Sequence, residues 1–128
     1  MRPPLGDLEL DVLHFVSDRA PITVREMAQQ FGEPRGLART TVLTVMENLR
    51  AKGYLTRRKA EKAFEYLPQG EKKDLLGGLV QRFVERTLQG SVSPVVAYLA
   101  NTRQLSGEDL AELGRLVDDL KAEREDKP

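Results

Sequence analysis

Residues 38–62 read ARTTVLTVMENLRAKGYLTRRKAEK. Four apolar residues in this stretch recur at positions i, i+3, i+4 and i+7: Val42, Val45, Met46 and Leu49. This spacing predicts an amphipathic helix with one buried stripe, and Gly53 predicts its end. Two threonines open the helix and a cluster of Arg and Lys follows it, although packing alone requires neither. The face opposite the stripe is therefore expected to serve a purpose other than packing.

Two shorter helices are predicted upstream of this stretch. Apolar residues at helical spacing over residues 5–16 predict a first helix, which Pro21 ends. The sequence TVRE, from Thr23 to Glu26, is a capping box that satisfies free amides at the start of a second helix. Gly32 is the expected left-handed terminator of that helix, and a turn rich in Gly and Pro follows. Two short helices flanking a tight turn are the elements of a helix-turn-helix.

The hydrophobic period changes after Gly53. Residues 54–58 (YLTRR) and 63–67 (AFEYL) are two short strand candidates, with Pro68 closing the second. A helix-turn-helix followed by a basic β-hairpin is a winged helix. We therefore expect a winged-helix domain over residues 1–70.

Residues 71–128 return to a helical pattern with three amphipathic segments. Such helices can fold back on the winged helix in one globule, or they can pair with a second copy of the chain. The second alternative is favoured because the last segment has the 3-4-3 apolar seam of helices that pair. The predicted fold is thus mainly α, with a C-terminal three-helix dimerisation domain. The residues expected at the dimer seam are Leu76, Leu79, Val80, Phe83, Leu110, Leu113, Val117 and Leu120.

Positive charge is concentrated in one window, although the whole chain has a net charge of zero. Residues 35–62 carry eight basic groups against two acidic ones, while both flanking regions are net acidic. Such a window offers a local surface for polyanions within a neutral protein. The alternative is an ordinary solvated charged surface.

The outward face of the central helix suits DNA. A helix about 10–12 Å across fits the major groove, which is about 12 Å wide. Threonine can bind bases or phosphates through its hydroxyl, and arginine can bind guanine or phosphate, while basic residues of the wing would hold the backbone. Threonine near a helix start is also an ordinary capping residue, which is the competing interpretation. The expected DNA-binding residues are Arg39, Thr40, Thr41, Thr44, Arg57, Arg58, Lys59 and Lys62.

Glu47 does not fit this scheme easily. Its carboxylate faces outward on the same helix and would repel phosphate. We expect it either to read a cytosine amine or to lie beyond the zone of contact.

The sequence argues against an enzyme and against a cofactor. The chain has no cysteine and one histidine, and no glycine pattern matches a phosphate-binding loop, so we expect no catalytic, cofactor or metal site. No apolar run approaches the roughly 20 residues that span a bilayer, and the N-terminus lacks an apolar signal core. These features are typical of a cytoplasmic protein without a membrane partner.

Several of these stretches resemble the penicillinase-repressor family, the BlaI/MecI/CopY group. They are LGDLELDVLHFV (5–16), ITVREM (22–27), ARTTVLTVMENLRAKGYLTRRK (38–59), AFEYLP (63–68) and SVSPVVAYLANTRQLSGEDLAELGRLVDDL (91–120). The resemblance implies a winged helix that binds a palindromic operator and a helical C-terminal domain that makes a homodimer. It also implies a role as a transcriptional repressor.

Two departures from the family concern its inducing signals. In β-lactam-responsive members a membrane sensor-protease pathway ends in cleavage of an Asn-Phe bond, which aligns with Tyr98-Leu99 here, so the cleavage motif is not retained. Copper-responsive members carry C-terminal cysteines, and this chain has none, which excludes copper sensing through thiolates. The predicted function is a dimeric, sequence-specific repressor acting on double-stranded operator DNA. The alternative is a winged helix that docks an acidic protein partner.

Overall fold

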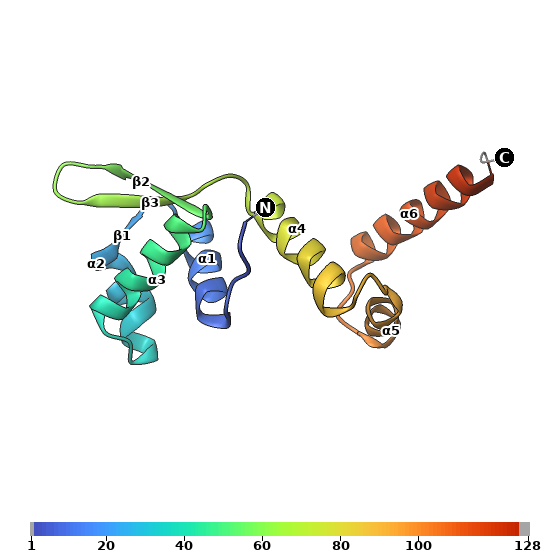
Figure 1. The fold of residues 1–128 in the computed structure, drawn as a ribbon, viewed down its shortest axis with the longest axis horizontal. Helices are drawn as coiled ribbons and strands as arrows, with labels where there is room; N and C mark the ends of the chain where they lie inside the picture. Colours follow the sequence, from blue (N-terminus) through green and yellow to red (C-terminus); the bar gives the residue numbers. More distant parts are fainter. Residues whose placement is uncertain (1, 126–128) are drawn as a thin grey trace. The chain divides into compact units, whose positions relative to one another are not determined.

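A computed structural model of the chain describes residues 2–125. Met1 and residues 126–128, which the two expected domains include, lie outside the described residues. The protein is mostly helical with one small antiparallel sheet, as expected (Figure 1). Contacts divide the chain into two compact units, Met1–Thr87 and Leu88–Pro128.

The first unit contains a winged helix and one further helix. Its elements are α1 (Asp7–Arg19), β1 (Ile22–Thr23), α2 (Val24–Met27), η1 (Ala28–Gly32), η2 (Glu33–Arg35), α3 (Arg39–Ala51), β2 (Leu55–Lys59), β3 (Phe64–Pro68), α4 (Lys72–Arg82) and η3 (Phe83–Thr87). The first three helices gather on one side of the β2–β3 hairpin (Figure 1). The domain boundary expected at residue 70 stays a prediction; in the structure α4 belongs to the first unit, and its Leu75 is buried in the core of that unit.

The sheet has the strand order β1-β3-β2. The two wing strands are one residue further along than predicted, and they pair from Leu55↔Pro68 to Lys59↔Phe64. The two-residue strand β1 was not predicted, and it pairs Ile22 with Tyr66. A strand of this length has no period of its own, so only its partner in space reveals it.

The core of the unit forms where α1 and α2 meet α3. The predicted stripe of α3 is confirmed, because all four of its residues are at most 8% exposed. Burial of each such side chain contributes roughly 1.5–3 kcal/mol. The expectation for Gly32 was wrong: its φ is −72°, and the left-handed residue is Gly36 with φ 68°. Gly32 instead lies at a close approach, since a Cβ there would lie 3.0 Å from Val42 Cγ2 and 3.2 Å from Leu37 O.

Glycine does end α3, as predicted. Gly53 has a φ of 87°, and the amide of Tyr54 donates to the carbonyl of Leu49 at 2.9 Å, which closes the helix with a Schellman motif. The N-terminal arm covers this end of the helix. Arg2 Nε donates to Gly53 O at 2.8 Å, and the Tyr54 hydroxyl donates to Pro3 O at 2.6 Å.

The second unit contains α5 (Ser93–Asn101) and α6 (Gly107–Glu125). Ser106 and Asp109 cap α6 reciprocally: the Asp109 amide donates to Ser106 Oγ at 3.0 Å, and the Ser106 amide donates to Asp109 Oδ2 at 3.2 Å. Neither helix has a buried residue among those the structure describes. The apolar side chains of this unit therefore remain largely open in a single chain.

Candidate nucleic-acid interface

The outward face of α3 carries the residues predicted to read DNA. Arg39, Thr40, Thr41 and Thr44 are all exposed; Thr40 and Thr44 lie opposite the buried stripe, and Arg39 and Thr41 lie on its flanks. The Thr44 hydroxyl donates to the carbonyl of Thr40 at 2.9 Å, so its oxygen can still accept a hydrogen bond. The threonines are free to meet a ligand at this face.

The threonines do not cap the helix. The N-cap of α3 is Ala38, which makes no side-chain capping bond. Capping by a side chain occurs instead at α2, where the Glu26 amide donates to Thr23 Oγ1 at 3.2 Å. The competing interpretation of Thr40 and Thr41 as capping residues therefore has no support in this geometry.

The wing presents a group of cations beside α3. Lys59 at the end of β2 and Lys62 in the hairpin loop are exposed. Arg58 is also exposed, and its Nε lies 3.3 Å from Glu65 Oε1 on the neighbouring strand. Exposed pairs of this kind are weak, so a phosphate can compete for Arg58.

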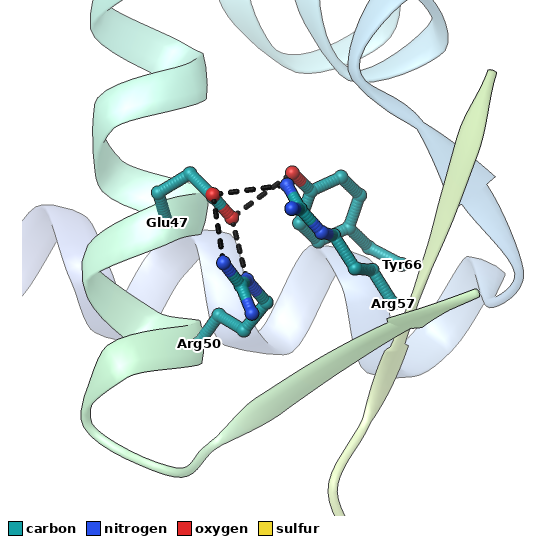
Figure 2. A network of polar contacts seen from close by, with 4 residues as sticks. All are labelled: Glu47, Arg50, Arg57 and Tyr66. Atoms are coloured by element: carbon teal, nitrogen blue, oxygen red, sulfur yellow. Dashed lines mark hydrogen bonds and ion pairs between the residues drawn. The ribbon is translucent and has the colours of Figure 1, made fainter. Parts of the chain in front are cut away.

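Arg57 is placed differently from the rest of the wing. Its Nη1 donates to Glu47 Oε1 at 3.0 Å, and its guanidinium lies 4.1 Å from the centre of the Phe64 ring. Glu47 also accepts from Arg50 at 2.8 and 3.1 Å and from the Tyr66 hydroxyl at 3.1 Å. Figure 2 shows these three donors converging on the carboxylate between α3 and the wing strands. Neither role expected for Glu47 anticipated this network.

The electrostatics of the network follow from these bonds. Hydrogen bonds from Arg50 lower the pKa of Glu47, partial burial opposes them, and the Tyr66 hydroxyl lowers it further. Burial raises the pKa of Tyr66. Glu47 is therefore ionised at neutral pH and Tyr66 is a neutral hydrogen-bond donor.

A pocket of about 350 Å³ lies between the start of α2, the outward face of α3 and the hairpin. It brings Arg39 and Arg57, which the sequence analysis had selected, together with Arg25 and Leu43, which it had not. Arg25 lies inside the TVRE capping box, and its basic charge was the signal that could have drawn attention to it. The pocket is thus lined by cations from three separate elements.

The chain is similar to known proteins over nearly all of its length. A model of the penicillinase repressor family matches residues 5–119. The chain belongs to the penicillinase repressor family. Its curated relatives include a penicillinase repressor of Bacillus licheniformis, 25% identical over 119 residues and covering 93% of each chain. Another is the transcriptional regulator BlaI of Mycobacterium tuberculosis, 29% identical over 125 residues and covering 97% of this chain and 90% of the relative.

A solved structure supports the fold of this repressor family member. The solution structure of monomeric Bacillus licheniformis BlaI in complex with the blaP half-operator matches with a TM-score of 0.51 and 24% identity. The match covers 58% of this chain and 90% of that one. The predicted family and winged-helix fold are confirmed. The family consists of transcriptional repressors and is not a class of enzymes.

The residues expected at the dimer seam fall into two groups by exposure: some are half-buried and the others are exposed. Leu76, Leu79 and Leu113 are half-buried, and Leu79 packs against the core of the winged helix. The others are exposed: Val80, Phe83, Leu110, Val117 and Leu120. Four more exposed apolar residues of the second unit were not selected from the sequence, namely Val92, Val96, Tyr98 and Leu116. The four-residue spacing of Val92 and Val96 was a usable signal.

Two further observations concern residues 2–125. No helix among them combines the length and apolar character needed to cross a membrane. Within the same residues, no group of three or more His, Cys, Asp or Glu side chains is arranged to hold a metal ion.

Proposed function

We propose that this protein is a sequence-specific transcriptional repressor that binds a two-fold operator as a homodimer. One observation carries the proposal: Thr40 and Thr44 lie opposite the buried stripe of α3, with exposed Arg39 and Thr41 on its flanks, beside a basic hairpin. In this mode α3 enters the major groove, its first turns contact base edges and the wing contacts phosphate. The relative named a penicillinase repressor, and the BlaI monomer solved with its half-operator, support this assignment.

The homodimer rests on the second unit. Its described helices bury no residue, yet they carry a row of apolar side chains along α6. A second copy would remove these from water with two-fold symmetry, and that symmetry would match two half-sites one helical turn apart or a multiple of it. The proposed place of action is the cytoplasm, and the mechanism is occupation of promoter DNA.

A sensor-protease step is not part of the proposed mechanism. The bond that aligns with the Asn-Phe cleavage site joins Tyr98 and Leu99 inside α5. The residue pair differs from the pair cleaved in the family, and its position is helical rather than extended. Neither feature favours the family's proteolytic switch.

The test is selection of fragments of the source genome by the purified protein, followed by affinity against salt for the best fragment. We expect enrichment of a short inverted repeat and a negative slope of log affinity against log salt of about 0.9 per phosphate contact. Recovery of fragments without a shared repeat would contradict the proposal. That result would favour the alternative in which the basic face docks an acidic protein.

A further inference from the structure

Glu47 lies on the same side of α3 as the threonines predicted to read DNA. At about 100° per residue, its side chain projects about 20° from the direction of Thr40 and about 60° from that of Thr44. An unpaired carboxylate at this position would repel the phosphates that flank a groove. Glu47 is not unpaired, and the residues that bind its carboxylate indicate its role.

The partners of Glu47 join the recognition helix to both strands of the wing. Arg50 comes from the last turn of α3, Arg57 from β2 and Tyr66 from β3. Arg57 and Tyr66 are directly paired in the hairpin register, and Tyr66 is only 1% exposed. Hydrogen bonds from both strands therefore hold the Glu47 carboxylate against the hairpin. The Arg57 guanidinium lies between that carboxylate and the Phe64 ring.

This arrangement restrains two guanidiniums that would otherwise be available to any phosphate. The side chains of Arg57 and Glu47 are 29% and 32% exposed, so a phosphate can approach but has to compete with a carboxylate already in place. Non-specific binding comes almost entirely from phosphate neutralisation, whereas operator binding adds contacts to base edges. If the operator complex relies on base contacts and leaves Arg50 and Arg57 on Glu47, the restraint lowers non-specific affinity more than operator affinity.

We infer that Glu47 is a positioning residue that sets DNA specificity by holding Arg50 and Arg57 back from indiscriminate phosphate contacts. The inference rests on the proposed DNA-binding function and adds to it. It assigns discrimination to a residue that need not touch a base.

The test compares Glu47→Gln with wild type, using the selected operator and a mixed-sequence duplex of equal length. Glutamine keeps the size of the side chain and an oxygen acceptor for Tyr66 but removes the charge. We expect about three-fold tighter binding to the mixed-sequence duplex, the scale of a released half-exposed ion pair. The salt slope for that duplex should steepen by about 0.9 for one added phosphate contact, and the preference for the operator should fall.

Glu61→Gln is the matched control. It removes the same charge from the exposed hairpin loop, while Arg50 and Arg57 keep their bonds to Glu47 and Arg58 keeps its bond to Glu65. We expect its operator preference to stay near that of wild type. An equal loss of preference in both variants would overturn the inference, because total charge would then explain the effect. Weaker binding of Glu47→Gln to both duplexes would also overturn it, since Glu47 would then be purely structural.

A second variant keeps the test independent of how well Glu47→Gln folds. If Glu47 restrains Arg57, then Arg57→Gln alone should change mixed-sequence affinity less than Arg58→Gln does. It should also abolish most of the gain that Glu47→Gln produces when the two changes are combined. An Arg57→Gln loss as large as that of Arg58→Gln would contradict the restraint. A wild-type protein without operator preference would instead refute the proposed function, which separates the two failures.

Discussion

The two compact units of this chain differ in how far they bury their apolar residues. The winged-helix unit encloses its own core, with Met46 and Leu49 of α3 fully buried beside Tyr54 and Tyr66 of the wing region. The second unit has no buried residue in its described part, and Val117 and Leu120 of α6 are about half exposed at 47% and 53%. The first unit buries its own apolar core, whereas the second leaves most of its large apolar side chains exposed.

This contrast suggests separate tasks for the two units in the proposed function: DNA binding for the first and dimerisation for the second. A folded head can present α3 to DNA without help from another chain, so its stability should not depend on protein concentration. In the proposed homodimer, the apolar faces of α5 and α6 gain free energy by association, so their contribution to stability should depend on protein concentration. The predictions below test these two kinds of stability.

The largest expected effect is loss of core packing in the winged helix. Leu49→Ala should lower the free energy of unfolding by about 2–5 kcal/mol, because it leaves a cavity beneath α3. The loss should be the same at all protein concentrations in urea unfolding followed by circular dichroism. Leu43→Ala, at a position 39% exposed on the same helix, is the control and should cost much less. A concentration-dependent loss for Leu49→Ala would break the distinction between the units.

The next effect is loss of the dimer. Val117→Asp places a charge in the apolar row of α6 and should weaken association about a hundredfold or more, because an unpaired charge is costly to bury. Sedimentation velocity would measure the change, and operator affinity should fall with it. Ala111→Asp adds the same charge on another side of α6, where the residue is exposed, and should leave the dimer intact. A tight dimer of the Val117→Asp variant would move the seam elsewhere, with residues 75–88 as the next candidate.

A smaller effect is expected at the recognition face. Thr40→Ala combined with Thr44→Ala should reduce operator preference by about 1–3 kcal/mol, the range for a base contact, and leave mixed-sequence affinity nearly unchanged. Competition binding against both duplexes would measure this. Equal losses for both duplexes would mean that these threonines support the helix rather than read bases.

The wing should show the complementary pattern. Arg58→Ala combined with Lys59→Ala should weaken binding to all duplexes alike and flatten the salt slope by about 0.9 for each phosphate contact removed. Titrations at several salt concentrations would give both quantities. An unchanged slope would mean that these two side chains do not contact phosphate.

The smallest effect is the pH dependence of Glu47. Its pKa is lowered in the folded state by the bonds from Arg50, so its contribution to stability is present above the unfolded pKa and is lost as pH falls through the folded one. Wild type should therefore lose stability faster than Glu47→Gln between about pH 5 and pH 3. Urea unfolding across this range would compare them. Parallel curves would show that the network does not stabilise the ionised carboxylate.

Sequence patterns predicted those parts of the fold that repeat locally. The stripe of α3, the Thr23–Glu26 capping box and the glycine end of α3 each follow from spacing within one segment. The strand β1 did not, because Ile22 becomes a strand only through its pairing with Tyr66. The positive φ was assigned to the wrong glycine because helical turns continue past Gly32 through Glu33–Arg35, so the left-handed conformation is reached only at Gly36.

The site was predictable only in part for the same reason. The exposed threonines and lysines follow from the helical period and the composition of the hairpin. The partners of Glu47 do not, because Arg57 and Tyr66 reach it only when the hairpin folds against α3. The N-terminal arm is similar: Pro3 is far from Tyr54 in sequence, and their hydrogen bond has no local signature.

The central claim is that the exposed faces of the second unit are covered by a second copy, so that two reading heads act together. Sedimentation equilibrium of the full chain, alone and with a duplex carrying either one or two half-sites, tests this most directly. The account predicts a particle of twice 14.4 kDa that prefers the two-site duplex. A particle of 14.4 kDa at every concentration, with equal affinity for both duplexes, would contradict it.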